Sequence, residues 1–405
     1  MMILLMAWRN IWRNKMRSII IMMSVALGLF AGIAILALYK GMMHSRVRTL
    51  IDAEAGHFQL HHVNFKNDYE SKFVMARGDS LLQQIRSLPG VKLAAKRSIT
   101  QGMLATATGS AGVQINGVVP EDEYMASQLK AKIIDGDVFD SSRKNEIMIG
   151  KKLAKKMKLK TGSKLVLTFT DSSGAIVSSA FRVKAIYESN NAPLDERNVY
   201  ILIHTLNELL GIGNNFHEIV VLLHNDEDVP LLYQQLQQQF SSCQIESWKE
   251  LSPESELMVK TVDVYSYIIM VIIMFALAFG IVNTMLMAIL ERTKEIGMMV
   301  ALGTGKASLF VLVLSETIFL TLAGTPFGLL ASWLITGYYS KHGLDLSGMG
   351  REMMSSFGYS TLIYPSFPTD KIVGVILIVF CTALLSCLFP AVKALKLKPV
   401  EALRR

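Results

Sequence analysis

The sequence predicts an α-helical membrane protein with four transmembrane helices and a large α+β domain inserted between the first helix and the second. Of its 405 residues, 51% are hydrophobic and 18% are charged, whereas a soluble domain averages about 25% charged residues. A transmembrane helix needs about 20 mostly apolar residues. The chain has apolar runs of this length at residues 18–39, 264–290, 307–338 and 372–392.

Basic residues lie beside alternate ends of these runs, within residues 9–17, 292–306 and 393–405. Cytoplasmic loops carry an excess of lysine and arginine, so we expect the connecting segment 291–306, the tail 393–405 and both termini in the cytoplasm. Residues 40–263 and the short loop 339–371 then lie outside. These basic groups account for the formal net charge of +8, and no nucleic-acid partner is predicted.

The spacing of apolar and basic residues in residues 1–17 predicts an amphipathic helix on the cytoplasmic membrane surface. We expect no cleavable signal there, because the stretch has no apolar core, and we expect the segment to be retained. A membrane anchor is the simple interpretation, and a dedicated partner contact is the alternative. The apolar face and the basic face consist of Leu4, Trp8, Ile11, Trp12 and Met16, and of Arg9, Arg13 and Arg17.

The large insertion predicts an α+β domain of two parts. Ser252, Pro253 and Glu254 form a helix start with a capping serine, a proline at the first position and an acid near the positive end of the helix dipole. A helix from there into the second span, beside a first span continued towards Arg48, would make a stalk. Strands are expected at 163–170, 179–188, 198–203 and 218–224, and helices at 78–88, 150–159 and 229–240.

Six lysines between residues 151 and 160 fall on one of these predicted helices. They could dock an acidic carrier or an anionic lipid. A solvated helix face is the simpler interpretation.

No segment carries an enzyme signature, and we expect no catalytic residue. GTGKAS at residues 303–308 resembles part of a phosphate-binding loop, but that pattern needs glycine in place of Val300 and serine or threonine in place of Ala307. We therefore expect no cofactor in this chain, and any ATP and Mg²⁺ on a separate subunit.

Histidines and cysteines predict neither a metal site nor a disulfide. His57, His61 and His62 lie on one predicted strand, with the first two on the same face, and no cysteine or spaced carboxylate completes a tetrahedral site. Cys381 and Cys387 fall in an apolar run, which leaves Cys243 alone in the polar region.

Glu316 lies well inside the third apolar run, where an ionisable side chain is costly and suggests a function. The alternative is a protonated or paired acid buried between helices. Further along, Gly324 and Gly328 form a GxxxG pattern around Pro326, which favours close helix packing and a kink.

The connecting segment 291–306 is too charged and too long for a plain hairpin between two spans. Ile296, Met299 and Val300 recur near helical spacing within it. With the four spans and the large insertion, this segment resembles the permeases of type VII ABC transporters, the MacB/FtsX-like superfamily. The residues that match the pattern are Glu291, Arg292, Glu295, Ile296, Gly297, Ala301, Gly303 and Glu316.

The resemblance implies that the segment couples the membrane domain to an ATPase, and that the insertion is a MacB-like domain of the porter and sabre type. By resemblance, Arg292, Lys294 and Glu295 would meet the ATPase surface. Gly297 and Gly303 would shape turns. The residues expected to anchor the segment are Ile296, Met298 and Leu302.

Among these permeases, the lipoprotein-releasing LolC/LolE type fits best, because the chain has a large outer domain and no fused ATPase. This type implies an inner-membrane complex with a cytoplasmic ATPase, a second permease copy or paralogue, membrane lipids, lipoprotein cargo and a LolA-like periplasmic carrier. Efflux of peptides or small molecules, and FtsX-like mechanotransmission to a periplasmic hydrolase, remain alternatives. From polarity alone, the expected acyl-chain cavity is lined by Phe30, Ile33, Met274 and Leu277.

Overall fold

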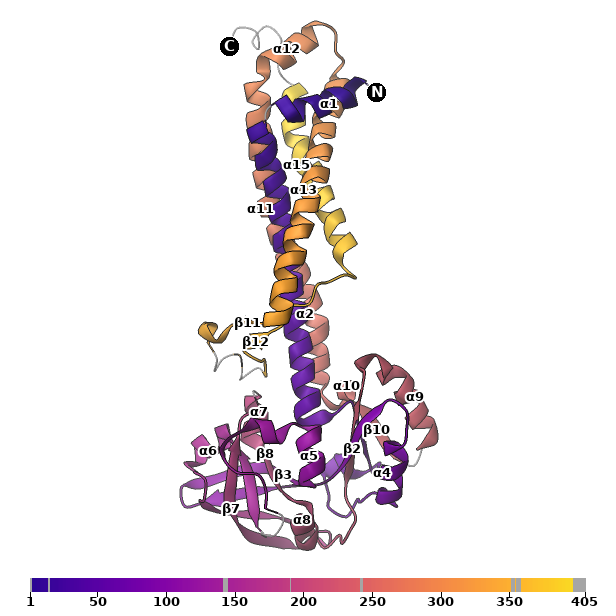
Figure 1. The fold of residues 1–405 in the computed structure, drawn as a ribbon, viewed down its shortest axis with the longest axis vertical. Helices are drawn as coiled ribbons and strands as arrows, with labels where there is room; N and C mark the ends of the chain where they lie inside the picture. Colours follow the sequence, from indigo (N-terminus) through magenta and orange to yellow (C-terminus); the bar gives the residue numbers. More distant parts are fainter. Residues whose placement is uncertain are drawn as a thin grey trace. The chain divides into compact units, whose positions relative to one another are not determined.

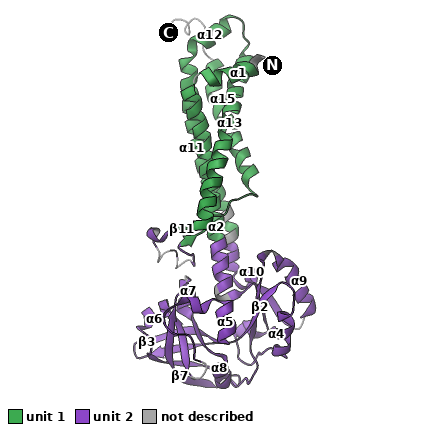
Figure 2. Ribbon diagram, in the orientation of Figure 1, with its two compact units in different colours: residues 1–43, 259–345, 362–405 green, residues 44–258, 346–361 purple. Residues whose placement is uncertain are grey.

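The computed structural model of the protein describes residues 2–13, 15–140, 145–189, 191–240, 243–350, 354 and 358–395. Two compact units share the chain (Figure 2). Unit 1 comprises residues 1–43, 259–345 and 362–405, and unit 2 comprises residues 44–258 and 346–361. The predicted tail 393–405 lies outside the described residues beyond Leu395.

Unit 1 is helical (Figure 1). Four of its described helices are long and apolar enough to cross a membrane: α2, α11 from Val264 onward, α13 and α15. These are the four predicted spans, and α2 and α11 also extend into unit 2. The bounds are α1 (Met2–Arg13), α2 (Lys15–Leu50), α11 (Pro253–Glu291), α12 (Thr293–Ala301), α13 (Lys306–His342), α15 (Ile372–Leu395), β11 (Leu344–Asp345) and β12 (Leu362–Ile363).

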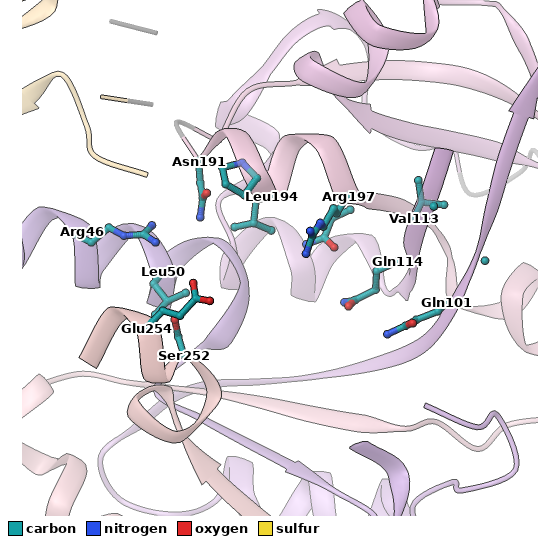
Figure 3. A pocket seen from close by; sticks show the side chains of 14 residues that line it. Arg46, Leu50, Gln101, Val113, Gln114, Asn191, Leu194, Arg197, Ser252 and Glu254 are labelled. Carbon is teal, nitrogen blue, oxygen red and sulfur yellow. The ribbon is translucent and has the colours of Figure 1, made fainter. Parts of the chain in front are cut away.

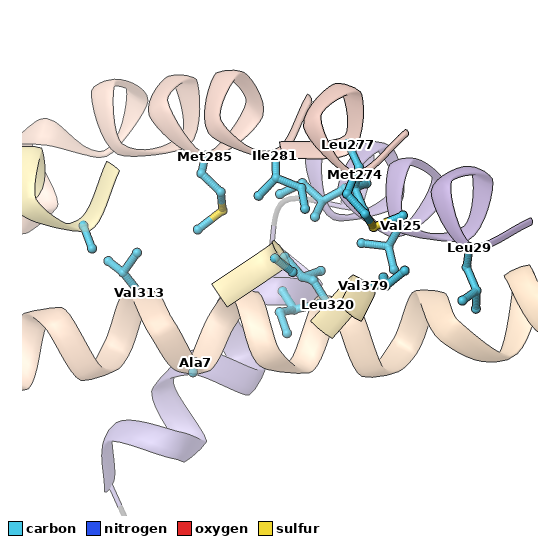
Figure 4. Close-up of a cluster of buried hydrophobic side chains, with 14 of the residues drawn as sticks. Ala7, Val25, Leu29, Met274, Leu277, Ile281, Met285, Val313, Leu320 and Val379 are labelled. Atoms are coloured by element: carbon cyan, nitrogen blue, oxygen red, sulfur yellow. The ribbon is translucent and has the colours of Figure 1, made fainter. Parts of the chain in front are cut away.

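The core of unit 1 is a single apolar cluster to which all of these helices contribute (Figure 4). Buried side chains of α2 recur every four residues at Ile21, Val25, Leu29 and Ile33, so one face of the helix points inward. The helix α11 also buries one side in this core, and its other side exposes large apolar residues such as Phe275 and Phe279. A helix that is apolar all round suits a bilayer.

Glycines set the closest helix contacts. A Cβ atom on Gly324 would come 2.7 Å from the backbone oxygen of Met22, and one on Gly328 would come 2.8 Å from that of Ala26. The GxxxG pattern of α13 therefore lies directly against the backbone of α2. Gly28 of α2 lies against Leu277 of α11 in a similar way, with its virtual Cβ 3.1 Å from a Leu277 methyl group.

The amphipathic N-terminal segment differs from the single helix predicted for residues 1–17. The helix α1 ends at Arg13 and α2 begins at Lys15, so Met16 and Arg17 belong to the first span and do not continue the faces of α1. Ser18 Oγ donates a hydrogen bond of 2.7 Å to the Ile11 carbonyl and joins the two helices. Trp8 and Trp12 are exposed, whereas Ala7 and Ile11 are buried.

Unit 2 contains one sheet of ten strands with helices packed on it. Its order is β10-β1-β9-β2-β3-β8-β5-β7-β4, with β6 joining β2 to β7. The strands are β1 (Phe58–His61), β2 (Val91–Thr106), β3 (Gly109–Val118), β4 (Ile133–Gly136), β5 (Glu146–Gly150), β6 (Lys164–Thr170), β7 (Ile176–Tyr187), β8 (Asn198–Leu202), β9 (Glu218–Leu223) and β10 (Gln244–Ser247). The main helices are α4 (Gly78–Arg86), α5 (Pro120–Ala126), α6 (Lys151–Met157), α7 (Ala192–Arg197), α8 (Ile203–Leu210), α9 (Val229–Gln239) and α10 (Trp248–Leu251), with a helical turn α3 (Phe65–Asp68).

The domain has the two parts that the sequence predicts, and β2 belongs to both. The first half of β2 pairs with β9 in an antiparallel sheet of order β10-β1-β9-β2. With α4 and α9 this half has the β-α-β-β-α-β order of a ferredoxin-like unit. The second half of β2 pairs with β3 and β6, and β2, β3, β8, β5, β7 and β6 close into a six-stranded ring. Each half has its own apolar core.

The predicted helix start at residue 252 is present, because α11 begins at Pro253. Ser252 Oγ donates to Ser255 Oγ at 2.8 Å within the first turn. The α10 helix just before it has a capping box in which Ser247 and Glu250 bond reciprocally. The helices α2 (Lys15–Leu50) and α11 (Pro253–Glu291) each include residues of both units.

The three histidines of the GHFQLHH stretch have separate partners. His57 Nε2 lies 2.9 Å from Asp226 Oδ1, His61 Nε2 lies 3.2 Å from Glu246 Oε2, and His62 stacks on Phe73. The described residues bring no group of three metal-ligating side chains together.

The lysine-rich helix α6 buries Leu153, Ala154 and Met157 against the ring and leaves its lysines outside. Lys151 pairs with Glu188 at 2.9 Å and Lys156 with Glu196 at 2.5 Å. The helix therefore has an apolar inner face and a charged outer face. Two lysines of the outer face have acidic partners.

Candidate functional site

The connecting segment between the second and third spans forms a short helix. The chain leaves α11 at Glu291, passes Arg292 in a non-helical conformation and enters α12 at Thr293. After α12, Gly303 adopts a φ of +91°, which favours glycine, and α13 begins at Lys306. Gly303 therefore shapes a turn as expected. Gly297 does not, because it is buried in the middle of α12.

One face of α12 packs on the core of unit 1. Ile296 is buried, and Met299 and Val300 are partly buried against the same cluster. The prediction that Met298 and Leu302 anchor the segment within the chain is wrong, because their exposed fractions are 52% and 83%. Successive residues of a helix are about 100° apart, so Met298 points away from Ile296.

The outward side of the segment combines charges with these two apolar side chains. Lys294, Met298 and Ala301 recur at helical spacing along α12 and so share its outer face. Glu291 before the helix, Glu295 within it and Leu302 just after it are also exposed. A surface with exposed methionine and leucine between charged residues is suited to a protein partner.

The connecting segment also contributes to a polar group that we call the Glu316 cluster: Asn10, Arg13, Arg292, Glu295 and Glu316. Glu316 Oε1 accepts a 2.6 Å hydrogen bond from Asn10 Nδ2 and a 3.2 Å bond from Arg292 Nη1. Arg292 is 8% exposed, and its Nε lies 3.7 Å from Glu295 Oε2. Glu295 also pairs with Arg13 at the end of α1.

The cluster connects three parts of the chain. Asn10 and Arg13 come from α1, Arg292 and Glu295 from the connecting segment, and Glu316 from the third span. Trp8 adds an edge-to-face contact with Phe319, with ring centroids 5.7 Å apart. A cavity of about 40 Å³ lies among Asn10, Arg292 and Glu316. The structure thus supports the paired-acid interpretation of Glu316.

Sequence reasoning singled out Arg292, Glu295 and Glu316 but missed Asn10. One signal was available, because Asn10 follows Ala7 by three positions and precedes Ile11, and both of these residues are buried. A polar residue on a buried helix face needs a partner. The sequence did not reveal that this partner is Glu316, more than three hundred residues away.

The residues expected to line an acyl-chain cavity do not line an open cavity in this structure. Ile33, Met274 and Leu277 are buried in the core of unit 1 and Phe30 is half-buried. They lie on the facing helices α2 and α11, where Gly28 contacts Leu277. Acyl chains would reach these side chains only if the two helices separated.

Four helices able to cross a membrane, an inserted domain of two parts and a charged helix between the second and third spans define a multi-pass membrane protein. Two family models match it: the MacB-like periplasmic core domain over residues 18–239 and the FtsX-like permease C-terminal model over residues 267–399. The chain belongs to the MacB/FtsX-like family of ABC transporter permeases.

The share of each relative's length that this chain matches differs between relatives. The lipoprotein-releasing system transmembrane protein LolC of Neisseria meningitidis is 23% identical over 97% of this chain and 95% of its own length. MacB of Bdellovibrio bacteriovorus, a macrolide export ATP-binding/permease protein, is 23% identical over 96% of this chain and 60% of its own length. An uncharacterized ABC transporter permease of Methanocaldococcus jannaschii is 27% identical over 55% of each chain.

The solved structures that match part of the chain include the periplasmic region of MacB from Actinobacillus actinomycetemcomitans. It has 13% identity and a TM-score of 0.36, and the match covers 52% of this chain and 94% of that one.

Proposed function

We propose that this chain is the permease subunit of an inner-membrane complex that uses ATP to extract lipoproteins towards a periplasmic carrier. The observation that supports lipoprotein release is the end-to-end match with LolC, which covers 97% of this chain and 95% of that protein. Matches to the ATP-binding/permease protein MacB cover 16% to 60% of its length. The match with LolC therefore covers more of the relative's length than these MacB matches do.

In this proposal ATP and Mg²⁺ bind to a separate cytoplasmic ATPase, and a second permease copy or paralogue completes the complex. The exposed face of α12 supports an ATPase contact, because it combines Lys294 with the exposed side chains of Met298 and Leu302. The basic residues near Arg13 and Lys306 favour a cytoplasmic location for this face and for both termini.

Acyl chains are the part of the cargo that makes ATP necessary. Each CH₂ group buried in a bilayer contributes about 0.8 kcal/mol, so removing several chains together costs far more than thermal motion supplies. We propose that they enter between α2 and α11 after Gly28 moves away from Leu277, which uncovers Ile33 and Met274.

The test uses the purified complex in nanodiscs with a triacylated lipoprotein and with the same protein lacking its acyl chains. We expect only the acylated form to stimulate ATP hydrolysis and to pass to a soluble carrier. Equal stimulation by both forms would move the function to export of peptides or small molecules. A co-purifying hydrolase with no cargo response would instead support mechanotransmission.

A second experiment tests the entry route. Cysteines replace Gly28 and Leu277 in a background without the three native cysteines, and oxidation joins α2 to α11. We expect the oxidised protein to lose lipoprotein-stimulated hydrolysis and to regain it after reduction. Each single-cysteine variant serves as the control, and full stimulation of the oxidised pair would exclude this route.

A further inference from the structure

Unit 2 contains a polar cleft that none of the features described above uses (Figure 3). Its volume is about 510 Å³, and residues from α2, α7, the start of α11 and strands β2 and β3 line it. A deeper recess of about 150 Å³ adjoins it and shares Leu50, Gln114, Asn198 and Ser252 with it. Pockets that hold small ligands have volumes of about 300–1,000 Å³.

Amide side chains are prominent on the walls. Gln101 and Gln114 are directly opposite each other in the β2–β3 register, and Asn191 and Asn198 lie at the two ends of α7. An amide carries both a donor and an acceptor, as every peptide group does. Such a surface suits an extended polypeptide better than an acyl chain or a large apolar drug.

Asn191 offers an unused acceptor. It is 5% exposed, and its Oδ1 has no hydrogen-bond partner among the described residues. Although Asn191 is the N-cap residue of α7, its side chain makes no capping bond. A buried acceptor without a hydrogen bond is unfavourable, because it has lost its contact with water. A peptide N–H entering the cleft would supply that hydrogen bond.

The charges on the cleft favour an acidic ligand. Arg46 and Arg197 both line it, against the single carboxylate of Glu254. In the view of Figure 3, Asn191 and Leu194 lie between the two arginines, and Gln114 and Gln101 follow Arg197. Arginine binds carboxylates through paired, charge-assisted hydrogen bonds, so acidic side chains along a bound peptide have cationic partners on both sides of Asn191.

We propose that this cleft binds an extended acidic segment of the cargo's polypeptide, separately from the site that receives its acyl chains. The assignment rests on the proposed function for the nature of the cargo, and the cleft itself rests on the amides, the two arginines and the unused acceptor of Asn191.

The test measures fluorescence anisotropy of a labelled Gly-Ser-Asn-Asp repeat peptide with the full-length protein in nanodiscs, without ATPase or acyl chains. The exposed Arg197 is changed in Arg197→Glu, and the buried acceptor is removed in Asn191→Leu. Lys155→Glu is the matched charge reversal, because Lys155 is also exposed in unit 2 but does not line the cleft. A peptide with lysine in place of aspartate, and an uncharged oligosaccharide, are the ligand controls.

We expect saturable binding of the acidic peptide, about tenfold weaker binding to Arg197→Glu, as loss of a charge-assisted contact predicts, weaker binding to Asn191→Leu, and no change for Lys155→Glu. Failure of the acidic peptide to bind, equal binding of the lysine peptide, preference for the oligosaccharide, or equal loss in Lys155→Glu would overturn the proposal. Peptide binding without lipoprotein-stimulated hydrolysis would instead leave the cleft in place and refute the proposed function.

Discussion

Arg292 Nη1 donates to Glu316 Oε1 across 3.2 Å, and both side chains are buried although they belong to different helical segments. Removing one partner of a buried ion pair leaves the other charge uncompensated, which costs about 3–5 kcal/mol, whereas replacing both with apolar residues is often neutral. The pair therefore fixes where the connecting segment leaves the second span relative to the third.

Glu316→Leu should lower the free energy of unfolding by about 3–5 kcal/mol, because Arg292 loses its buried carboxylate. The double variant with Arg292→Met should recover most of this loss. Thermal or denaturant unfolding in mixed micelles gives the comparison, with the exposed Glu291→Leu as a control expected to change stability by less than about 0.5 kcal/mol. A double variant as unstable as Glu316→Leu alone would contradict a role based on charge pairing.

Met298→Glu and Leu302→Glu should weaken association with the ATPase without unfolding the permease. Both side chains are exposed on α12, so a charge there meets water in the free chain but an apolar partner surface in the complex. Co-purification of the ATPase and its hydrolysis rate measure the effect. Ile176→Glu, at an equally exposed apolar residue of unit 2, is the control. Normal assembly of both α12 variants would place the ATPase contact elsewhere.

The two sides of the membrane can be assigned by labelling. In a background lacking Cys243, Cys381 and Cys387, a single cysteine replaces either Lys160 or Lys306, which are both exposed. An impermeant maleimide added to intact spheroplasts should label the first and reach the second only after permeabilisation. The opposite pattern would reverse the orientation of the whole chain.

Two buried groups of unit 2 should give opposite pH dependence. Burial raises the pKa of Asp195 to about 6 from 3.8, against the opposing hydrogen bonds from Ser189. Folding therefore favours the neutral acid, and its contribution to stability is lost as pH rises from about 4 to about 6. Burial lowers the pKa of His217 to about 4 from 6.5, so its contribution to stability is lost as pH falls from about 6.5 to about 4.

Asp195→Asn removes the carboxyl group, and with it the contribution to stability that is lost as pH rises. We expect the variant to lose stability on acidification from pH 6 to pH 4 more steeply than the unmodified protein, by about 1 kcal/mol per pH unit. Melting temperatures across this interval measure the difference. The exposed Asp137→Asn is the control, and an identical pH profile for Asp195→Asn would show that Asp195 does not titrate in this range.

Long, strong patterns were predictable from the sequence. An apolar run as long as residues 264–290 indicates a transmembrane helix. The start of α11 was predictable because Ser252 and Pro253 are a local helix-start signal. Local patterns also predicted part of the insertion, namely β6, β7, β8, β9, α4, α6 and α9, but not the long strand β2. The break between α1 and α2 was not, because helical spacing continues from Trp12 to Met16 and no proline or glycine interrupts it.

Relationships between distant residues were not predictable. Nothing near Glu316 identifies Asn10 as its partner, and nothing in β6 indicates that it closes a ring on β2. The anchoring role expected of Met298 and Leu302 failed for a geometric reason. Apolar character marks a residue as suited to burial. Its position around the helix relative to Ile296 decides whether it packs on the core or is exposed.

The closed ring of β2, β3, β8, β5, β7 and β6 also bears on how the domain tolerates crowding on a membrane surface. Unpaired strand edges attract the backbones of neighbouring chains and seed aggregation. Every strand of the ring has a neighbour on both sides, and among the described strands of the large sheet only β4 and β10 pair on one side. Both span only four residues. Many copies can therefore stand close together without offering one another a long edge to extend.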